Sequence, residues 1–167
     1  IFHATPNFND DPQHIKGGYY VLRLAELLES ENVKIIVAGN YPESLQVPDN
    51  LILLGNISDQ RELAKYYSMA DVTVLTSKKE TFSMVVAESL CCGTPVVGFK
   101  AGAPEQIALI EECNFVEWGN TANLKEAVSE ILMNIGRRQC IADIAKQRYS
   151  KNTMVEKYRA LYVEITA

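Results

Sequence analysis

The sequence predicts an α/β protein with a doubly wound, Rossmann-like parallel sheet and helices on both of its faces. Apolar runs and helical patterns alternate about six times along the chain with short links between them, as in βαβ units. The apolar runs are continuous rather than alternating, which is typical of strands covered on both faces. A length of 167 residues suits one domain that spans residues 1–167.

Six short apolar runs are predicted to form the strands. The run at residues 51–54 reads Leu-Ile-Leu-Leu and is closed by Gly55. Residues 5–13, which follow the first run, are rich in Pro, Asn and Asp and are predicted to form a loop. In chain order, the predicted strands are residues 1–4, 33–38, 51–54, 71–75, 95–99 and 115–117.

Helical spacing and capping residues predict the helices between these strands. Apolar residues recur at helical spacing in residues 18–29, and Ser58 or Asp59 can cap a helix that runs to about residue 69. Thr81 or Ser83 can cap a helix that begins near residue 82. The remaining predicted helices are residues 104–110, a helix from 121 or 123 to about 134, residues 137–148, and a last helix from about 152 to 165.

Composition excludes several classes of function. The 16 basic and 21 acidic residues give a net charge of −5, which argues against a nucleic-acid partner. The four cysteines include no C-x-x-C pair and only two histidines accompany them, so we predict no metal site. No apolar run approaches the roughly 20 residues of a membrane helix, and we predict a cytoplasmic protein. The chain begins with a strand and no initiating Met, so we expect it to be part of a longer protein.

Polar residues and glycines gather in the loops that follow the predicted strands. In doubly wound sheets ligands bind outside these carboxyl ends. The helix that begins near residue 82 offers unpaired N–H groups and a partial positive charge to a phosphate. Lys16, just before Gly17 and Gly18, can add a positive charge at the same edge. We therefore expect an anionic ligand there, although a lone lysine is more often a surface residue.

Glu80 and Glu88 lie eight residues apart around the start of that helix. Because carboxylates repel phosphate, they suit sugar hydroxyls better, and one carboxylate can accept two hydrogen bonds from a diol. The pair could then reach opposite ends of an extended nucleoside-diphosphate-sugar. The alternative is a solvated helix surface, where two such glutamates are common.

A longer block resembles a known family. It comprises Glu80-Thr-Phe-Ser-Met-Val-Val-Ala-Glu88-Ser-Leu-Cys-Cys-Gly93-Thr94-Pro95-Val96-Val97, followed by Gly102-Ala103-Pro104-Glu105. This block is similar to the E-x7-E signature of glycosyltransferase family 4, a family of retaining enzymes with the GT-B fold. Shorter matches, in order, are Lys16-Gly17-Gly18, Val37-Ala38-Gly39, Leu54-Gly55-Asn56-Ile57, Ala70-Asp71-Val72 and Tyr158-Arg-Ala-Leu-Tyr162. The resemblance implies the donor-binding half of a GT-B architecture.

The resemblance also implies roles for individual residues. Glu80 contacts the transferred sugar as the catalytic residue, Glu88 binds the nucleotide ribose, and Lys16 binds the diphosphate. Ile57 contacts the base through its backbone. The remaining residues expected to bind the nucleotide-sugar are Gly17, Thr81, Phe82, Ser83 and Met84. The donor is expected to be UDP- or GDP-linked, with no cofactor and no metal.

Two departures from the family pattern affect this site. The family carries an arginine shortly before the lysine, whereas residues 1–15 contain none, and His3 is the only nearby candidate to replace it. Thr81 stands where the family has a glycine. These departures bear on how the diphosphate is held, and they shift its expected binding toward Lys16 and the backbone amides.

The resemblance places the acceptor site on an amino-terminal half that this chain lacks. We therefore expect the isolated chain to bind nucleotide weakly and to transfer nothing. The last helix, from about residue 152, is expected to pack across onto that other half and to expose its apolar residues here.

The leading hypothesis is the donor-binding domain of a retaining glycosyltransferase. Its acceptor would be a saccharide or a lipid-linked molecule, in synthesis of a surface polysaccharide such as a capsule or of a glycolipid, with possible peripheral membrane association. Two alternatives stay open: a sugar-nucleotide epimerase, which shares the two-half architecture, and a non-catalytic nucleotide-binding or interaction module that has kept the fold.

Overall fold

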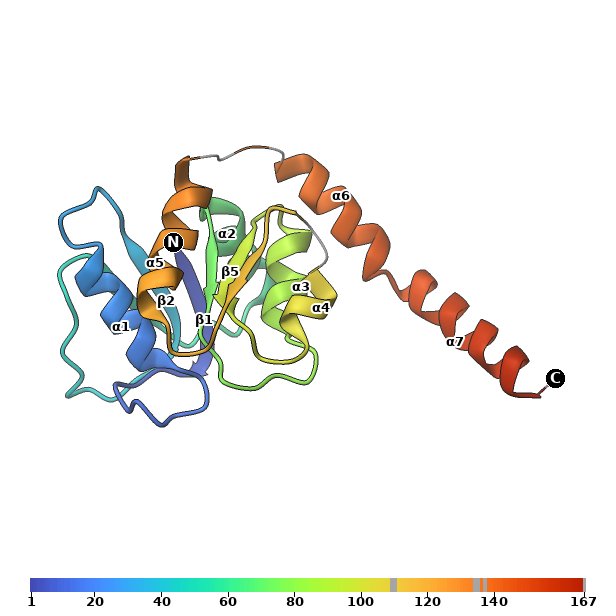
Figure 1. Ribbon diagram of the computed structural model, residues 1–167, viewed down its shortest axis with the longest axis horizontal. Coiled ribbons are helices and arrows are strands. Elements are labelled where there is room, and N and C mark those ends of the chain that lie inside the picture. Colours follow the sequence, from blue (N-terminus) through green and yellow to red (C-terminus); the bar gives the residue numbers. More distant parts are fainter. Residues whose placement is uncertain (109–110, 134–135, 137, 167) are drawn as a thin grey trace.

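A six-stranded, parallel sheet forms the centre of the protein in a computed structural model, which describes residues 1–108, 111–133, 136 and 138–166 (Figure 1). Every described strand pair runs parallel, and the spatial order is β3-β2-β1-β4-β5-β6. The prediction of a doubly wound parallel sheet is thus confirmed. The strands are β1 (Phe2–Asn7), β2 (Ile35–Asn40), β3 (Leu51–Gly55), β4 (Thr73–Leu75), β5 (Val96–Phe99) and β6 (Asn114–Val116).

Helices cover both faces of this sheet. The apolar cores place α1 and α5 on one face, and α2, α3, α4 and α6 on the other. The helices are α1 (Gly18–Leu27), α2 (Gln60–Met69), α3 (Met84–Cys91), α4 (Pro104–Ala108), α5 (Thr121–Met133), α6 (Arg138–Arg148) and α7 (Lys151–Thr166). The predicted helix ends at Ile110, Asn134 and Arg137 lie outside the described residues.

The order of the strands reverses beside β1. The chain moves outward from β1 to β2 and β3, and then returns to β4 on the other side of β1. The loop after β1 leads to α1 on one face, whereas the loop after β4 leads to α3 on the opposite face. Such a reversal opens a crevice at the carboxyl ends of the two neighbouring strands, and ligands of this fold class bind in it.

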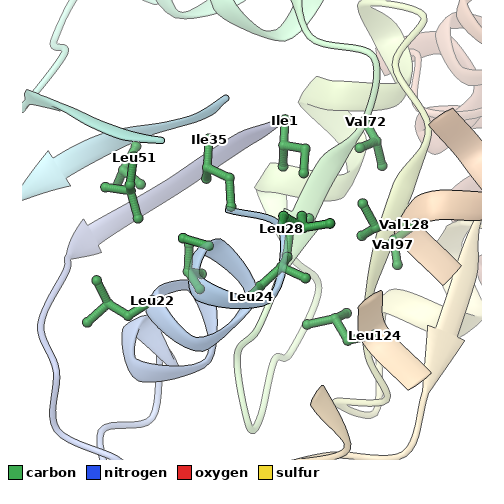
Figure 2. Packing of buried hydrophobic residues seen from close by; sticks show 14 of the residues in the cluster. Ile1, Leu22, Leu24, Leu28, Ile35, Leu51, Val72, Val97, Leu124 and Val128 are labelled. Atoms are coloured by element: carbon green, nitrogen blue, oxygen red, sulfur yellow. The ribbon is translucent and has the colours of Figure 1, made fainter. Parts of the chain in front are cut away.

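The largest apolar core lies between the sheet and the helices α1 and α5 (Figure 2). Leu24 of α1 and Leu28, the residue that follows α1, pack in this core with Ile35 of β2, Val97 of β5 and Val128 of α5, and all five side chains are fully buried. Full burial of one such side chain stabilises a fold by about 1.5–3 kcal/mol. This packing holds α1 against the sheet, and α1 directly follows the loop that carries Lys16.

A polar network joins the elements on the opposite face. The hydroxyl of Ser89 on α3 donates to the carbonyl of Thr94 over 2.8 Å and lies 2.7 Å from Thr73 Oγ1 on β4. Thr94 Oγ1 donates in turn to the Tyr67 carbonyl over 2.6 Å and accepts from the Arg138 guanidinium over 2.8 Å. Since buried polar groups are costly when unpaired, this network holds α2, α3 and α6 in one arrangement.

Several predicted boundaries differ from the structure by two or three residues, as for β2 (Ile35–Asn40, predicted 33–38) and β4 (Thr73–Leu75, predicted 71–75), and two of the differences concern the site. The strand β1 extends to Asn7, although residues 5–13 were predicted to be a loop. Pro6 is tolerated there because the pairing of β1 with β2 is irregular between Ala4 and Asn7. The helix α3 begins at Met84 rather than near residue 82.

The last helix, α7, has no buried residue and extends away from the sheet (Figure 1). Its exposed apolar side chains include Tyr162, Val163 and Ile165, which are 64%, 68% and 70% exposed. The expectation of an exposed apolar last helix is therefore confirmed. Among the described residues, no helix combines the length and the apolar character needed to cross a membrane.

His3 lies inside the sheet on β1 and is 1% exposed. Its Nδ1 donates to the Val74 carbonyl over 2.9 Å, so the proton of the neutral ring sits on Nδ1. Burial lowers the pKa of His3 to about 4, against the raising effect of the bond to Val74 and with a further lowering by Lys16. His3 is thus neutral near pH 7 and cannot replace the absent arginine as a cation, which corrects the sequence-based interpretation.

The buried His3 makes stability depend on pH. Because the pKa of His3 is lowered on folding to about 4, its neutral form stabilises the fold above the unfolded pKa of about 6.5, and this contribution is lost as the pH falls toward 4. A difference of this size corresponds to roughly 3 kcal/mol. We expect the free energy of unfolding of His3→Asn to fall less steeply than that of the wild type between about pH 7 and pH 4. Denaturant unfolding at several pH values measures this, and parallel curves for the two proteins would contradict it.

Candidate functional site

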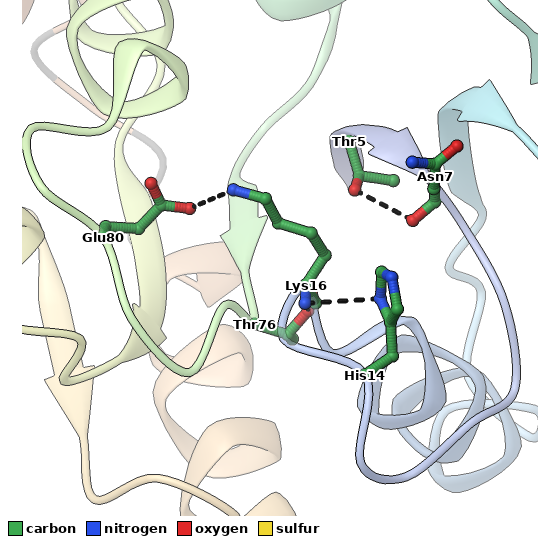
Figure 3. A network of polar contacts seen from close by, with 6 residues as sticks. All are labelled: Thr5, Asn7, His14, Lys16, Thr76 and Glu80. Atoms are coloured by element: carbon green, nitrogen blue, oxygen red, sulfur yellow. Dashed lines mark hydrogen bonds and ion pairs between the residues drawn. The ribbon is translucent and has the colours of Figure 1, made fainter.

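An ion pair joins the two loops at the reversal of strand order. Lys16 Nζ, in the loop after β1, lies 2.8 Å from Glu80 Oε1, in the loop after β4 (Figure 3). The side chains are 29% and 14% exposed, so both reach solvent at the carboxyl edge of the sheet. The structure therefore brings together two predicted site residues that are 64 positions apart in the sequence.

Close backbone contacts fix the position of Lys16. Thr76 Oγ1 donates to the Lys16 carbonyl over 3.1 Å, and the Lys16 N–H donates to His14 Nδ1 over 3.4 Å (Figure 3). Gly17 has a φ of 67°, and a Cβ there would lie 2.1 Å from the Thr76 carbonyl oxygen. Only glycine suits this position, because any side chain would push the two loops apart. Gly17 thus allows the loop that carries Lys16 to pack closely against Thr76.

Glu105 holds the loop beside Glu80. Its carboxylate accepts hydrogen bonds from the N–H groups of Ala101 over 3.1 Å and Gly102 over 3.0 Å, while the Glu80 N–H donates to the Ala101 carbonyl. Burial acts to raise the pKa of Glu105, but these bonds and the charge of Lys100 outweigh it and the pKa is lowered. No role for Glu105 was predicted from the sequence, although an acid in the first helical turn, directly after Pro104, is a signal for one.

Ser83 occupies a strained position at the start of α3. Its φ of 70° and ψ of 88° lie in the left-handed region, which non-glycine residues rarely adopt. The Ser83 hydroxyl is buried and has no hydrogen-bond partner among the described residues. The prediction that its side chain caps the helix is therefore wrong, because this backbone conformation leaves the hydroxyl unbonded to the first N–H groups of α3.

The start of α3 is open to solvent on either side of Ser83. Phe82 is 43% exposed and Met84 is 62% exposed. A helix start carries unpaired N–H groups and about half a positive charge. The predicted binding residues Thr81, Phe82 and Met84 thus lie where a phosphate group can approach the backbone.

A cavity of about 220 Å³ opens beside Glu88 at the same edge of the sheet. We call it the Glu88 cavity. Its volume is below the roughly 300–1,000 Å³ that suits a whole drug-sized ligand, so it would hold one part of an extended ligand. It is lined by Ala4, Thr5, Pro6, Ala38, Gly39, Asn56, Ile57, Leu63, Tyr67, Val85 and Glu88.

The Glu88 cavity brings Ile57 and Glu88 together, as expected for two residues that bind one nucleoside. Glu88 Oε2 accepts a hydrogen bond from the Tyr67 hydroxyl over 3.1 Å. Tyr67 was not predicted to be a site residue, because the pattern of a tyrosine within an amphipathic helix predicts a core position. Lys16 and Glu80 do not line this cavity.

Two further features bear on the choice of site. A cavity of about 440 Å³ lies at the opposite edge of the sheet, near Ile1, Lys34 and Asp71. That edge carries the amino ends of the strands, where this fold class does not bind ligands. Within the described part of the chain, no three His, Cys, Asp or Glu side chains are grouped to hold a metal ion.

Comparison with known proteins identifies related sequences. The chain is 24% identical over 161 residues to N-acetyl-alpha-D-glucosaminyl L-malate synthase of Bacillus anthracis. The aligned part covers 87% of this chain and 41% of that protein. It is 30% identical over 163 residues to an uncharacterized glycosyltransferase of Methanocaldococcus jannaschii, with 88% and 41% covered. The chain thus spans less than half the length of these relatives.

Solved structures share the fold. Anabaena HepE in complex with UDP matches with a TM-score of 0.74 at 19% identity, covering 98% of this chain and 48% of that one. A glycosyltransferase from Rickettsia africae matches with a TM-score of 0.76 at 18% identity, covering 99% and 48%. At this identity the likeness shows the fold alone, which is that of one half of a GT-B glycosyltransferase.

The model of the family "Glycosyl transferases group 1" matches residues 13–148, from the loop before α1 to the end of α6. This match covers well over half of the chain and includes Lys16, Glu80 and Glu88. The chain therefore belongs to the glycosyl transferases group 1 family.

Proposed function

We propose that this chain is the donor-binding domain of a retaining glycosyltransferase of family 4, and that it binds a nucleoside-diphosphate-sugar. One observation carries the proposal. The Lys16–Glu80 pair and the Glu88 cavity both lie at the carboxyl edge of the sheet, and the open start of α3 connects Glu80 to Glu88 along the chain. This arrangement suits the sugar, the diphosphate and the nucleoside of one extended ligand.

The charges of the site suit the chemistry of sugar transfer. As the bond between sugar and diphosphate breaks, negative charge grows on the diphosphate and positive character grows on the sugar ring. Lys16 and the start of α3 stabilise the first charge, and Glu80 stabilises the second. The protein itself supplies these charges at the start of α3, so the proposed reaction uses neither a cofactor nor a metal ion.

The names of related proteins suggest the donor but leave the acceptor broad. HepE from Anabaena has been solved in complex with UDP and with UDP-glucose. The names of relatives contain L-malate, diacylglycerol and D-inositol 3-phosphate, so the molecules that carry the sugar differ within this group. We propose a UDP- or GDP-linked donor and a saccharide or lipid-linked acceptor, in synthesis of surface polysaccharide or glycolipid. The longer enzyme would act in the cytoplasm or at the membrane surface.

Family membership favours a transferase over the two alternative functions. A sugar-nucleotide epimerase would release epimerised donor when no acceptor is present. A non-catalytic module would have no need to keep Lys16, Glu80 and Glu88 at one edge. Product analysis of the longer protein, with and without acceptor, separates the three functions.

We expect Glu88→Ala and Lys16→Ala each to weaken binding of UDP or GDP to this chain by about tenfold or more, because each removes a charge-assisted hydrogen bond to the ligand. Isothermal titration calorimetry measures the affinity. Glu126→Ala on α5 and Lys65→Ala on α2 are matched controls, because both side chains are exposed away from the Glu88 cavity. If neither nucleotide binds the wild-type chain at millimolar concentration, the proposed function is wrong.

We expect Glu80→Gln to lower the transfer rate of the longer enzyme by about 100-fold or more, since it removes the charge that faces the sugar. Donor affinity should stay within a few-fold of wild type, because Lys16 and Glu88 are kept. Steady-state kinetics and calorimetry on one preparation measure the two quantities. Transfer that survives the substitution at the wild-type rate would exclude a catalytic role for Glu80. The 167-residue chain alone should bind nucleotide and show no transfer.

A further inference from the structure

Tyr67 on α2 lies against Glu88 across the gap between two helices. Its hydroxyl donates to Glu88 Oε2 over 3.1 Å, and both side chains line the Glu88 cavity. Tyr67 is 1% exposed. Burial raises the pKa of the Tyr67 hydroxyl far above its usual value, and the negative charge of Glu88 raises it further. The hydroxyl therefore keeps its proton and donates a hydrogen bond to the carboxylate.

Both the ring and the backbone of Tyr67 are held in place. It packs edge-on against Phe2 of β1, with ring centroids 5.0 Å apart and planes at 90°. The Tyr67 carbonyl accepts a hydrogen bond from Thr94 Oγ1 over 2.6 Å, and Thr94 also accepts from Arg138. A donor fixed in this way defines one position for the Glu88 carboxylate.

Glu88 needs such a partner. A glutamate side chain has several rotatable bonds, and ordering it costs conformational entropy of about 1.5–2 kcal/mol at most. The next residue, Ser89, is hydrogen-bonded within the buried network, which fixes the backbone of α3. These bonds do not fix the side chain of Glu88. Among the described residues, the Tyr67 hydroxyl is the hydrogen-bond donor recorded for the Glu88 carboxylate.

We propose that Tyr67 is a positioning residue that orients Glu88 toward the ribose of the donor and thereby sets the preference for ribonucleotides over deoxyribonucleotides. This inference rests on the proposed function. The Tyr67 hydroxyl uses one acceptor position of Oε2, so Oε1 and the remaining position of Oε2 stay available to the two hydroxyls of a ribose. A carboxylate oriented before binding loses less entropy when the ribose arrives.

The test compares Tyr67→Phe with Tyr66→Phe on the 167-residue chain. Both variants remove one phenol oxygen from neighbouring residues of α2 that pack on Phe2, but only Tyr67 bonds Glu88. UDP, GDP and their 2′-deoxy counterparts are titrated into each protein by calorimetry. We expect Tyr67→Phe to weaken binding of the ribonucleotides by about fivefold and that of the 2′-deoxyribonucleotides clearly less, because these keep only one of the two hydroxyls that Glu88 binds. Tyr66→Phe should match the wild type.

A double-variant cycle separates positioning from packing. When Tyr67→Phe is added to Glu88→Ala, we expect no further loss of affinity, because the hydroxyl acts only through the carboxylate. The double variant also serves if Tyr67→Phe alone folds poorly. In the single variant the Glu88 carboxylate has lost its hydrogen-bond donor, whereas in the double variant that carboxylate is absent. A merely structural role would weaken both kinds of nucleotide equally, in either background. That result, or an unchanged ribose preference in Tyr67→Phe, would overturn the proposal.

Failure of the inference can be told apart from failure of the proposed function. If Glu88→Ala leaves the preference for ribonucleotides intact, Glu88 does not bind the ribose and the proposed site is wrong. If Glu88→Ala abolishes the preference while Tyr67→Phe retains it, the proposed site stands and only the positioning role of Tyr67 is wrong.

Discussion

The position of β1 between β2 and β4 controls the geometry of the whole ligand edge. Parallel pairing on both sides aligns the carboxyl ends of these strands at one edge. The following loops must then leave toward opposite faces, because α1 and α3 pack on different sides of the sheet. The crevice between these loops is a result of topology rather than of any single side chain. The side chains of Lys16 and Glu80 meet across it because each belongs to one of these loops.

Packing on both faces of the sheet holds the walls of this crevice in place. On one side, the buried apolar residues Val21, Leu22, Leu24 and Ala25 hold α1, which begins directly after Gly17, against the sheet. On the other side, hydrogen bonds among Ser89, Thr94 and Arg138 tie α3 to α2 and α6. An apolar core permits small shifts of a helix, whereas a buried polar network is satisfied in only one arrangement. The network is therefore well suited to the face that carries Glu88 and Tyr67, where the direction of hydrogen bonds matters.

Local patterns in the sequence were enough to predict the elements and the residues of the signature block. Asp59 caps α2 as expected, with its side chain accepting from the Arg61 N–H over 2.8 Å. Features that depend on distant residues could not be predicted. The extension of β1 past Pro6 relies on β2, where the Asn40 carbonyl accepts from the Phe8 N–H. No short pattern encodes a hydrogen bond between Tyr67 and Glu88, which lie 21 residues apart on different helices.

The conformation of Ser83 was also beyond prediction from the sequence. A serine before a helix usually caps it through its side chain. Here the chain must turn from the loop that presents Glu80 into a helix that points Glu88 at the cavity, and Ser83 absorbs that turn at a φ of 70°. A left-handed conformation in a non-glycine residue costs of the order of 1–3 kcal/mol and persists only where surrounding contacts enforce it. Its presence beside the proposed diphosphate position indicates a site shaped before the ligand arrives.

The Lys16–Glu80 pair resolves an apparent conflict in the site. A carboxylate close to a diphosphate would repel it, yet the proposed chemistry needs a carboxylate beside the sugar. With Lys16 Nζ 2.8 Å from Glu80 Oε1, the two charges offset one another in the free protein. Because both side chains are partly exposed, the pair itself adds little to stability and can be rearranged at small cost. Lys16 can then turn toward an incoming phosphate, which leaves the charge of Glu80 directed at the sugar where positive character develops.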